Sequence, residues 1–188
     1  METIFTPLIV RSYYSLLQGT SSPEALCRRA ARLGYTHLAL TDRDNLYGLW
    51  RFLHACRQEK IIPLIGAEIT EPGSKKTAVC LAKDQTGYTN LCQIITDRHC
   101  DTGFQLLENI RNHGKGLIVL CSDIDMLLSW KNSGLEVAAN LGRKPAAESR
   151  ILYRQAVKHD IPAIAAPDSM LAEAAEYSLH LLLRVIAG

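Results

Sequence analysis

The sequence predicts an α/β fold with a largely parallel sheet, and three observations support this. Short apolar runs typical of strands alternate with segments of helical periodicity along the chain. Some runs, such as 37–41, are almost continuously apolar, as strands covered on both faces require. No linker-like stretch divides the 188 residues, a length that suits one sizeable domain. About six or seven strands are expected, which favours a barrel over an open sheet.

The first third of the chain carries a clear helix signal between two predicted strands. Residues 8–10 form the first apolar run. Ser22, Pro23 and Glu24 then supply an N-cap, a proline at the first helical position and an acid in the first turn. Gly34 suits the end of this helix, because glycine accepts the left-handed conformation that follows many helices.

The remaining elements follow in order and include one hairpin. Residues 71–74, Glu-Pro-Gly-Ser, predict a turn between the strand-like segments 69–70 and 77–81. These two segments are therefore expected to form a hairpin inserted in an otherwise βαβ series. Predicted strands cover 37–41, 61–65, 69–70, 77–81, 117–121, 135–139 and 163–166, and predicted helices cover 47–59, 88–98, 104–112, 124–130, 146–159 and 171–186.

Composition excludes several classes of protein. Lys and Arg number 21 and Asp and Glu 19, giving a net charge of +2, which argues against a dedicated electrostatic nucleic-acid binder but not against part of a larger nucleic-acid enzyme. The six cysteines show no Cys-x-x-Cys spacing, and the N-terminus has no signal-peptide pattern. We therefore expect a cytoplasmic protein with reduced thiols and no membrane contact.

Charged side chains recur directly after the predicted strands, where α/β folds bind ligands. Arg11 follows the first strand, and Asp42, Arg43 and Asp44 follow the next; Glu68, Asp123 and Asp168 follow later ones. Asp42 and Asp44 could instead cap the following helix. Asp42, Glu68 and Asp168 together could bind a hard cation such as magnesium or manganese. A polar network held by arginine is the competing interpretation.

Five stretches of the chain, in order, carry a resemblance to a known family. They are residues 11–19, 30–35, 38–48, 62–68 and 87–92, with residues 161–168 as a later echo. On these stretches the chain resembles the polymerase-and-histidinol-phosphatase (PHP) domain that opens the bacterial DNA polymerase III alpha subunit. The sequences of residues 45–48 and 66–70 are similar to those of the error-prone, translesion class of that polymerase.

The resemblance implies a distorted seven-stranded β/α barrel with a polynuclear zinc or manganese site at its C-terminal mouth. In metal-binding relatives, a His-x-His pair follows the first strand, an Asp-His pair the second and a Glu the third. Later His or Cys ligands and an Asp-x-His complete the set. Such sites hydrolyse phosphate esters or proofread DNA with metal-activated water.

The chain departs from this pattern at most ligand positions. Ile9 and Arg11 stand at the His-x-His positions, and Gln18 stands at the next ligand. Arg43 replaces the histidine after Asp42, and Met170 replaces the last one. Asp42, Glu68 and Asp168 remain, with Asp44 nearby; His99 is a candidate for a later ligand, and Asp123 stands where relatives often have cysteine.

These departures predict a degenerate metal site. Isoleucine and methionine do not ligate hard metals, and arginine is effectively always protonated. Acids left without a metal need a replacement cation, because a buried unpaired charge is costly. We expect Arg11, and less firmly Arg43, to lie within salt-bridge reach of Asp42, Glu68 or Asp168. No cofactor and no catalytic residue are expected.

The leading functional interpretation is a non-catalytic PHP domain, residues 1–188, at the N-terminus of a longer polymerase. The resemblance implies a parent that is a DNA-directed DNA polymerase, a nucleotidyltransferase of DNA replication or translesion synthesis. The domain would brace the palm domain and offer a docking surface. The resemblance also implies a proofreading exonuclease subunit as a partner in replicative relatives, and contact with DNA through the full-length enzyme. The alternative is a residual metal-dependent phosphoesterase or 3′–5′ exonuclease that uses Asp42, Glu68, Asp168 and His99.

Overall fold

The computed structural model describes residues 5–142 and 147–187, and the chain divides into two compact units. The first unit combines the N-terminal part, through Ile65, with the C-terminal part from Asp168 onward. The second unit comprises Gly66–Pro167. The first unit therefore depends on contacts between segments far apart in the sequence.

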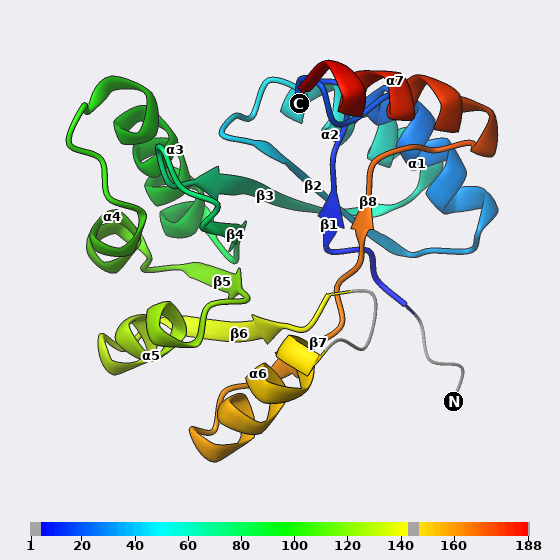
Figure 1. The fold of residues 1–188 in the computed structure, drawn as a ribbon. Helices are drawn as coiled ribbons and strands as arrows, with labels where there is room; N and C mark the ends of the chain where they lie inside the picture. Colours follow the sequence, from blue (N-terminus) through cyan, green and yellow to red (C-terminus); the bar gives the residue numbers. More distant parts are fainter. Residues whose placement is uncertain (1–4, 143–146, 188) are drawn as a thin grey trace. The chain divides into compact units, whose positions relative to one another are not determined.

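In the first unit, both ends of the chain meet in a short parallel sheet. Strand β1 (Ile9–Val10) pairs with β8 (Asp168–Ser169), and Ile9 lies opposite Asp168. Helix α1 (Pro23–Arg32), strand β2 (His37–Arg43) and helix α2 (Leu49–Glu59) follow β1 along the chain (Figure 1). The 3-10 helix η1 (Ala174–Glu176) and helix α7 (Tyr177–Ala187) follow β8.

Helix α1 begins where the local sequence predicts. The Ser22 hydroxyl accepts a hydrogen bond from the Ala25 amide at 3.2 Å, and Pro23 occupies the first helical turn. Gly34 follows the helix with a φ of +77°, a left-handed conformation that glycine adopts without strain. The buried faces of α1 and α2 form one apolar cluster with β2, which includes Leu26, Cys27, Leu40, Phe52 and Cys56.

Helix α2 begins without a side-chain cap. Its N-cap residue is Gly48, and neither Asp42 nor Asp44 caps it, so the capping alternative is wrong. A Cβ on Gly48 would lie 2.9 Å from a ring carbon of Tyr14. The close approach of that ring therefore requires glycine at the start of the helix.

The C-terminal segment is tied to the loop before α1. The Ser21 hydroxyl and the Ala172 amide both donate to the Glu176 carboxylate, the latter at 3.0 Å. Burial raises the pKa of Glu176, but the hydrogen bonds it accepts outweigh burial, so the pKa is lowered. The predicted helix over 171–186 starts later, at Ala174 and Tyr177, because residues before it pair with β1 and cap η1.

The second unit is built on a mixed sheet. Strand β3 (Ile62–Thr70) starts in the first unit and continues into the second, where β4 (Thr77–Ala82) pairs with it antiparallel. Strand β5 (Leu117–Cys121) is antiparallel to β4, whereas β6 (Glu136–Asn140) and β7 (Ala163–Ile164) continue in parallel. The predicted hairpin and the predicted strand 117–121 are confirmed.

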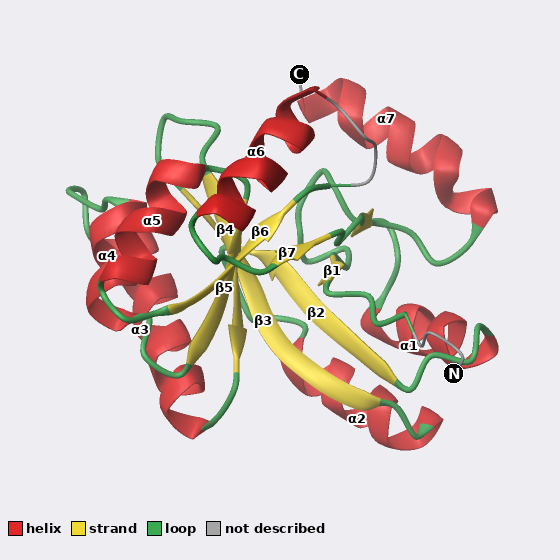
Figure 2. Ribbon diagram, turned by 90° about the horizontal axis from the view of Figure 1, so that it is seen from below, coloured by secondary structure: helices red, strands yellow, loops and turns green. Residues whose placement is uncertain are grey.

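Four helices lie among the described residues of the second unit. They are α3 (Gln85–Cys100), α4 (Leu106–His113), α5 (Ile124–Asn132) and α6 (Ala147–Lys158). Figure 2 shows α3, α4 and α5 along one side of strands β4 to β6. Trp130 is fully buried in this unit, and its indole nitrogen donates to the Leu107 carbonyl at 2.9 Å. Ala146, the predicted start of α6, lies outside the described residues.

The α/β class is confirmed, with more antiparallel pairing than predicted. The strand order is β2-β3-β4-β5-β6-β7 in one sheet and β1-β8 in the other. The described strands thus form a two-stranded and a six-stranded sheet. The sheet is mixed because the inserted strand β4 runs antiparallel to both of its neighbours.

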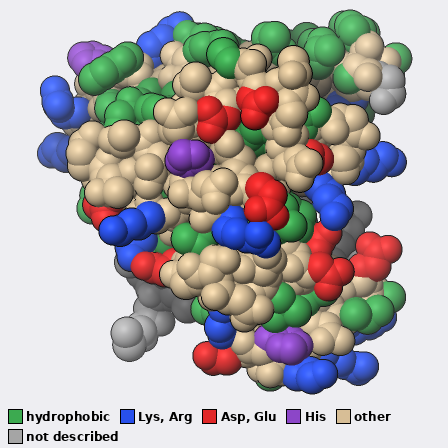
Figure 3. Space-filling model, turned by 90° about the vertical axis from the view of Figure 1, so that its left-hand side faces the viewer, with side chains coloured by type: hydrophobic (Ala, Val, Ile, Leu, Met, Phe, Trp, Pro, Cys, Tyr) green, Lys and Arg blue, Asp and Glu red, His purple; other side chains and the backbone are tan. Residues whose placement is uncertain are grey.

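The surface fits the near-neutral composition. On the face drawn in Figure 3, basic and acidic side chains are interspersed. Within the described part of the chain, no helix is both long enough and apolar enough to cross a bilayer. All six cysteines, which fall among the described residues, are free thiols.

Candidate functional site

Asp42, at the end of β2, is enclosed by donors from the loop that follows β1. Only 1% of the surface of Asp42 is exposed to solvent. Its Oδ1 accepts from the Ser12 amide and from the Ser15 hydroxyl, both at 2.7 Å. Its Oδ2 accepts from the Ser12 hydroxyl at 2.7 Å. Both carboxylate oxygens are therefore engaged by neutral donors of this chain.

The electrostatics of Asp42 follow from this enclosure. Burial raises its pKa above the usual value and is the largest influence. The hydrogen bonds from Ser15 and Ser12 and the charge of Arg11 act in the opposite direction without cancelling it. Asp42 is thus an acid whose charged form is disfavoured by its site, and which serves as the acceptor for a local hydrogen-bond network.

The loop around Asp42 is held in place from both sides. The Val10 amide donates to the Thr41 hydroxyl at 2.9 Å, which joins β1 to β2 next to the carboxylate. A Cβ on Gly19 would lie 2.0 Å from the Ser12 carbonyl oxygen, so only glycine fits where the loop closes. The Gln18 carbonyl accepts from His180 Nδ1 at 2.9 Å, and the Gln18 side chain is half-buried.

Arg11 and Asp168 form the second polar contact of the first unit. Arg11 is 4% exposed, and its amide donates to the Ser169 carbonyl at 2.9 Å, which continues the β1–β8 pairing. Its guanidinium donates to Asp168 Oδ2 at 2.9 Å, and the Asp168 side chain is 46% exposed. The expectation that Arg11 lies within salt-bridge reach of one of the three acids is confirmed for Asp168.

The other candidate positions of the first unit take part in strand pairing, packing and loop hydrogen bonds. Ile9 is buried in β1 opposite Asp168. The Met170 carbonyl accepts from the Thr20 amide at 3.1 Å. Arg43 ends β2 with an exposed side chain, and its amide donates to the Ser15 hydroxyl at 3.1 Å. Asp44 has a φ of +54°, a left-handed conformation that aspartate tolerates better than most residues.

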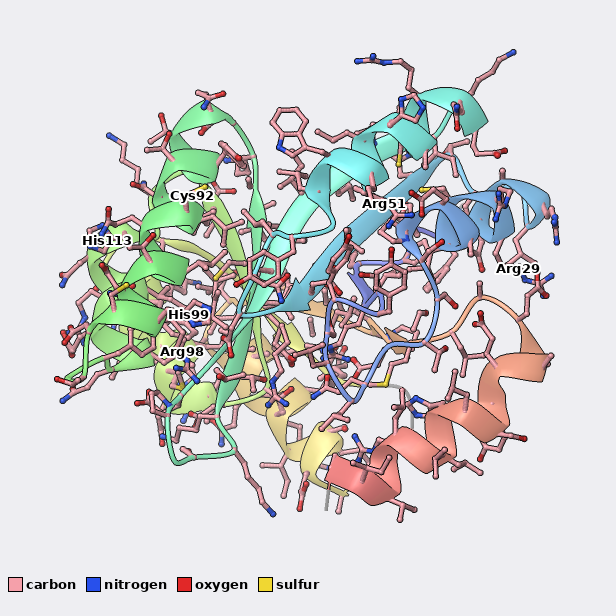
Figure 4. All side chains as sticks on the ribbon, turned by 90° about the horizontal axis from the view of Figure 1, so that it is seen from above. Arg29, Arg51, Cys92, Arg98, His99 and His113 are labelled. Atoms are coloured by element: carbon pink, nitrogen blue, oxygen red, sulfur yellow. The ribbon has the colours of Figure 1, made fainter. Side chains whose placement is uncertain are left out.

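Three candidates lie in the second unit, whereas Asp42 belongs to the first. Glu68 is buried in β3, opposite Val79 of β4. His99 is exposed in the last turn of α3, near its labelled neighbour Arg98 in Figure 4. Asp123 caps α5, because its Oδ1 accepts from the amides of Asp125 and Met126 at 3.0 and 3.1 Å. Asp123 therefore has a structural role as an N-cap.

The donor set does not fit the metal site that the resemblance implies. Across residues 5–142 and 147–187, no group of three or more His, Cys, Asp and Glu side chains is arranged to hold a metal. Ile9 is an alkyl side chain, Arg11 is a cation paired with Asp168, and the oxygens of Asp42 already accept three hydrogen bonds. A hard cation needs free oxygen or imidazole ligands instead.

Ser12 and Ser15 are the residues that sequence reasoning missed. The sequence showed them only as polar residues of the stretch 11–19. Both are buried, and serine is seldom buried without a hydrogen-bond partner. Their position shortly after a predicted strand was the available signal. It does not indicate their partner, because Asp42 lies 30 and 27 residues away in the sequence.

Comparison with known proteins identifies the class. Residues 8–141 match the PHP domain family, and the chain belongs to that family. An error-prone DNA polymerase of Anaeromyxobacter dehalogenans is 42% identical over 105 residues, 53% of this chain. The DNA polymerase III subunit alpha of Bacillus subtilis is 44% identical over 95 residues, 48% of this chain. An error-prone DNA polymerase of Pseudomonas paraeruginosa is 35% identical over 173 residues, 84% of this chain.

The chain is short beside these relatives, and its fold is shared more widely. It spans 9%, 8% and 16% of the lengths of these three polymerases. An amidohydrolase of Chromobacterium violaceum shares the fold with a TM-score of 0.67 at 15% identity, over 88% of this chain and 87% of that one. A two-domain Bacteroides vulgatus protein, described as containing a predicted PHP-like metal-dependent phosphoesterase, has a TM-score of 0.67 at 10% identity, over 89% of this chain and 52% of that one.

Proposed function

We propose that this chain is the non-catalytic N-terminal PHP domain of a DNA polymerase III alpha-type polymerase, acting in DNA replication or translesion synthesis. Its role is structural: it braces the rest of the polymerase chain and offers it a docking surface. The names of its relatives and the small share of their length that it spans support this parent. In this proposal residues 1–188 are a single PHP domain, and the resemblance implies the distorted seven-stranded barrel for that family.

The single observation that carries the proposal is the state of Asp42. A ligating aspartate must present free lone pairs to a cation, whereas this one accepts three hydrogen bonds from Ser12 and Ser15. Arg11, at a position where metal-binding relatives have histidine, instead carries a fixed positive charge and pairs with Asp168. These features support a metal site converted to a hydrogen-bond and salt-bridge network.

Metal content and hydrolysis test the proposal directly. The chain, purified without chelators, is expected to carry far less than one equivalent of zinc or manganese by plasma emission. It is also expected to release no phosphate from a phosphomonoester and no nucleotide from single-stranded DNA above background with either metal added. Near-stoichiometric metal, with chelator-sensitive hydrolysis that Glu68→Ala abolishes, would instead establish the residual phosphoesterase or exonuclease.

Helix α7 supports the docking role. Its exposed residues include a set of aliphatic side chains: Leu179, Leu181, Leu182, Val185 and Ile186. A contiguous exposed apolar face marks an interaction surface in most soluble proteins. We assign this face to the rest of the polymerase chain, which in the relatives is many times longer than this one.

The isolated chain should associate through α7. Sedimentation velocity is expected to show concentration-dependent dimers or larger species, which the double variant Leu182→Glu/Val185→Glu converts to monomer. Leu33→Glu is the matched control, because Leu33 is an exposed leucine at the C-cap of α1, and it should leave association unchanged. A chain that is monomeric throughout the concentration range would count against the docking face.

A further inference from the structure

One exposed surface of the first unit differs in chemistry from α7. Tyr47 and Trp50, at the start of α2, are 71% and 77% exposed. The second tryptophan of the chain, Trp130, is 0% exposed. Large aromatic side chains that stay this exposed are characteristic of binding surfaces, since burial is otherwise their main stabilising contribution.

The aromatic pair continues into a cationic helix face. Trp50, His54 and Arg57 follow one another at spacings of four and three, so they share one face of α2, and all three are exposed. Tyr47 lies just before the helix, and with it these residues make up the α2 stripe, whose helical part from Trp50 to Arg57 is about 10 Å long. The one acid among the eleven residues of α2 is Glu59, which is half-buried.

The base of the α2 stripe is held rigidly. The Tyr47 ring packs edge-on against Tyr14, with centroids 6.5 Å apart and planes at 68°. The Tyr47 amide donates to the Asn45 side chain at 3.1 Å, and the buried Asn45 amide donates to the Tyr14 and Arg43 carbonyls at 3.1 and 2.7 Å. Preorganisation of this kind lowers the entropy lost when a ligand binds.

Arg51 is adjacent to the stripe on α2, but its guanidinium is engaged by other residues. Its guanidinium pairs with Glu24 at 2.6 Å and lies 5.8 Å from the centre of the Tyr13 ring, between α1 and α2 (Figure 4). Tyr13 in turn packs against Tyr14 at 4.7 Å. The rings of Tyr13, Tyr14 and Tyr47 therefore pack in series, which holds Tyr47 in place.

We propose that the α2 stripe of Tyr47, Trp50, His54 and Arg57 is a contact site for single-stranded DNA. Exposed bases stack on tyrosine, tryptophan and histidine rings and on guanidinium planes. Arg57 supplies a cation for the phosphate backbone. The stripe has no exposed aliphatic side chain and no exposed acid, unlike the aliphatic face of α7, and this combination suits a polyanion with aromatic bases better than a protein surface. The choice of DNA rather than RNA rests on the proposed function.

Tryptophan fluorescence of the chain tests this site. Titration with an eight-residue oligothymidylate is expected to quench the emission of the exposed Trp50, and Trp50→Phe should abolish most of that signal. In a fluorescence-anisotropy titration with labelled oligothymidylate, Trp50→Ala should weaken binding between about 5-fold and about 100-fold. Tyr153→Ala is the matched control, because Tyr153 is an exposed tyrosine of the second unit, and its affinity should equal that of the wild type.

Salt dependence separates stacking from simple charge attraction. A plot of the logarithm of the binding constant against the logarithm of salt concentration should have a slope of about −0.7, as for one neutralised phosphate. Arg57→Ala should bring this slope closer to zero. Inorganic polyphosphate should compete poorly with the oligonucleotide. The proposal is overturned by equal competition from polyphosphate, by tighter binding of oligouridylate, or by Trp50→Ala affecting self-association in place of DNA binding. These readouts involve neither metal nor hydrolysis, so they succeed or fail separately from the proposed function.

Discussion

Asp42 and Asp168 both lie in strands of the first unit, yet their charges are stabilised in different ways. Asp42 is buried and surrounded by neutral donors, the Ser12 amide and two serine hydroxyls. Asp168 is half-exposed and pairs with a guanidinium. In the metal-binding pattern of the family, both positions would instead be ligands. The two acids lie in different sheets of the structure, and the fold accommodates their carboxylates in two different ways.

The difference between the two acids follows from solvent access. Water reaches Asp168, so one charged partner and hydration together are enough to stabilise it. Water does not reach Asp42, and a buried carboxylate needs its hydrogen-bonding capacity filled by the protein. A buried site of this kind is stabilised by hydrogen bonding more than by charge, and each of the following predictions tests that contrast.

The largest effect is expected at Asp42 and depends on shape rather than charge. Asp42→Ala leaves the Ser12 amide and two hydroxyls without their acceptor and opens a cavity, so it should lower the free energy of unfolding by about 3 kcal/mol or more. Asp42→Asn can accept from the Ser12 amide and the Ser15 hydroxyl and can donate to the Ser12 hydroxyl. It should therefore cost about 1 kcal/mol or less, as measured by urea denaturation with unchanged m-values.

The two variants together decide the role of this carboxylate. If Asp42→Asn were as damaging as Asp42→Ala, the charge itself would be essential, and the comparison with Asp168 would fail. The double variant Ser12→Ala/Ser15→Ala provides an independent control. It removes two of the three donors to Asp42, and should fall between the other two variants in stability.

A smaller effect is expected at the pair of buried Arg11 and half-exposed Asp168. Arg11→Ala should lower the free energy of unfolding by about 1 to 2 kcal/mol, because it removes a buried stem and the partner of a half-exposed acid. Asp168→Asn keeps a carbonyl oxygen for the guanidinium and should cost less than Arg11→Ala in the same urea titration. Arg11→His should not restore phosphate release, since Ile9, Arg43 and Met170 still lack imidazoles. A gain of metal-dependent hydrolysis in Arg11→His would contradict the degenerate-site proposal.

Local signals made much of this fold predictable from sequence. Ser22, Pro23 and Gly34 mark α1 because capping and helix termination depend on neighbouring residues. The Arg11–Asp168 contact was also within reach, because both residues follow apolar runs that suggest strand ends. Residues at the ends of neighbouring strands are expected to meet even when 157 positions separate them in the sequence.

Features fixed by distant contacts were missed. Strand β8 has two residues and exists through its pairing with β1, so no local periodicity marks it. Its presence delays the last helix relative to the predicted start at Leu171. The enclosure of Asp42 was missed for the same reason, since Ser12 and Ser15 look like ordinary loop residues until the loop closes over the carboxylate.

The smallest effect is a pH dependence whose sign differs between Asp42 and Glu176. The pKa of Asp42 is raised in the folded chain by burial, so the folded state binds more protons than the unfolded state between the usual aspartate pKa and the raised value. Stability contributed by Asp42 therefore falls as pH rises through that window. Burial also acts on Glu176, but its hydrogen bonds from Ser21 and Ala172 outweigh burial and lower its pKa. Its contribution is present above the usual glutamate pKa and is lost as pH falls through the lowered value.

The prediction is read as differences between each wild-type and variant pair in urea midpoints from pH 3 to pH 7. Relative to Asp42→Asn, the wild type should lose stability as pH rises. Relative to Glu176→Gln, it should gain stability as pH rises, with the change complete near the usual glutamate pKa. Parallel slopes of the same sign would mean that Asp42 is charged and stabilised in the fold like an ordinary surface acid. In that case hydrogen bonding would outweigh burial at Asp42 as it does at Glu176, and the contrast between these two acids would not stand.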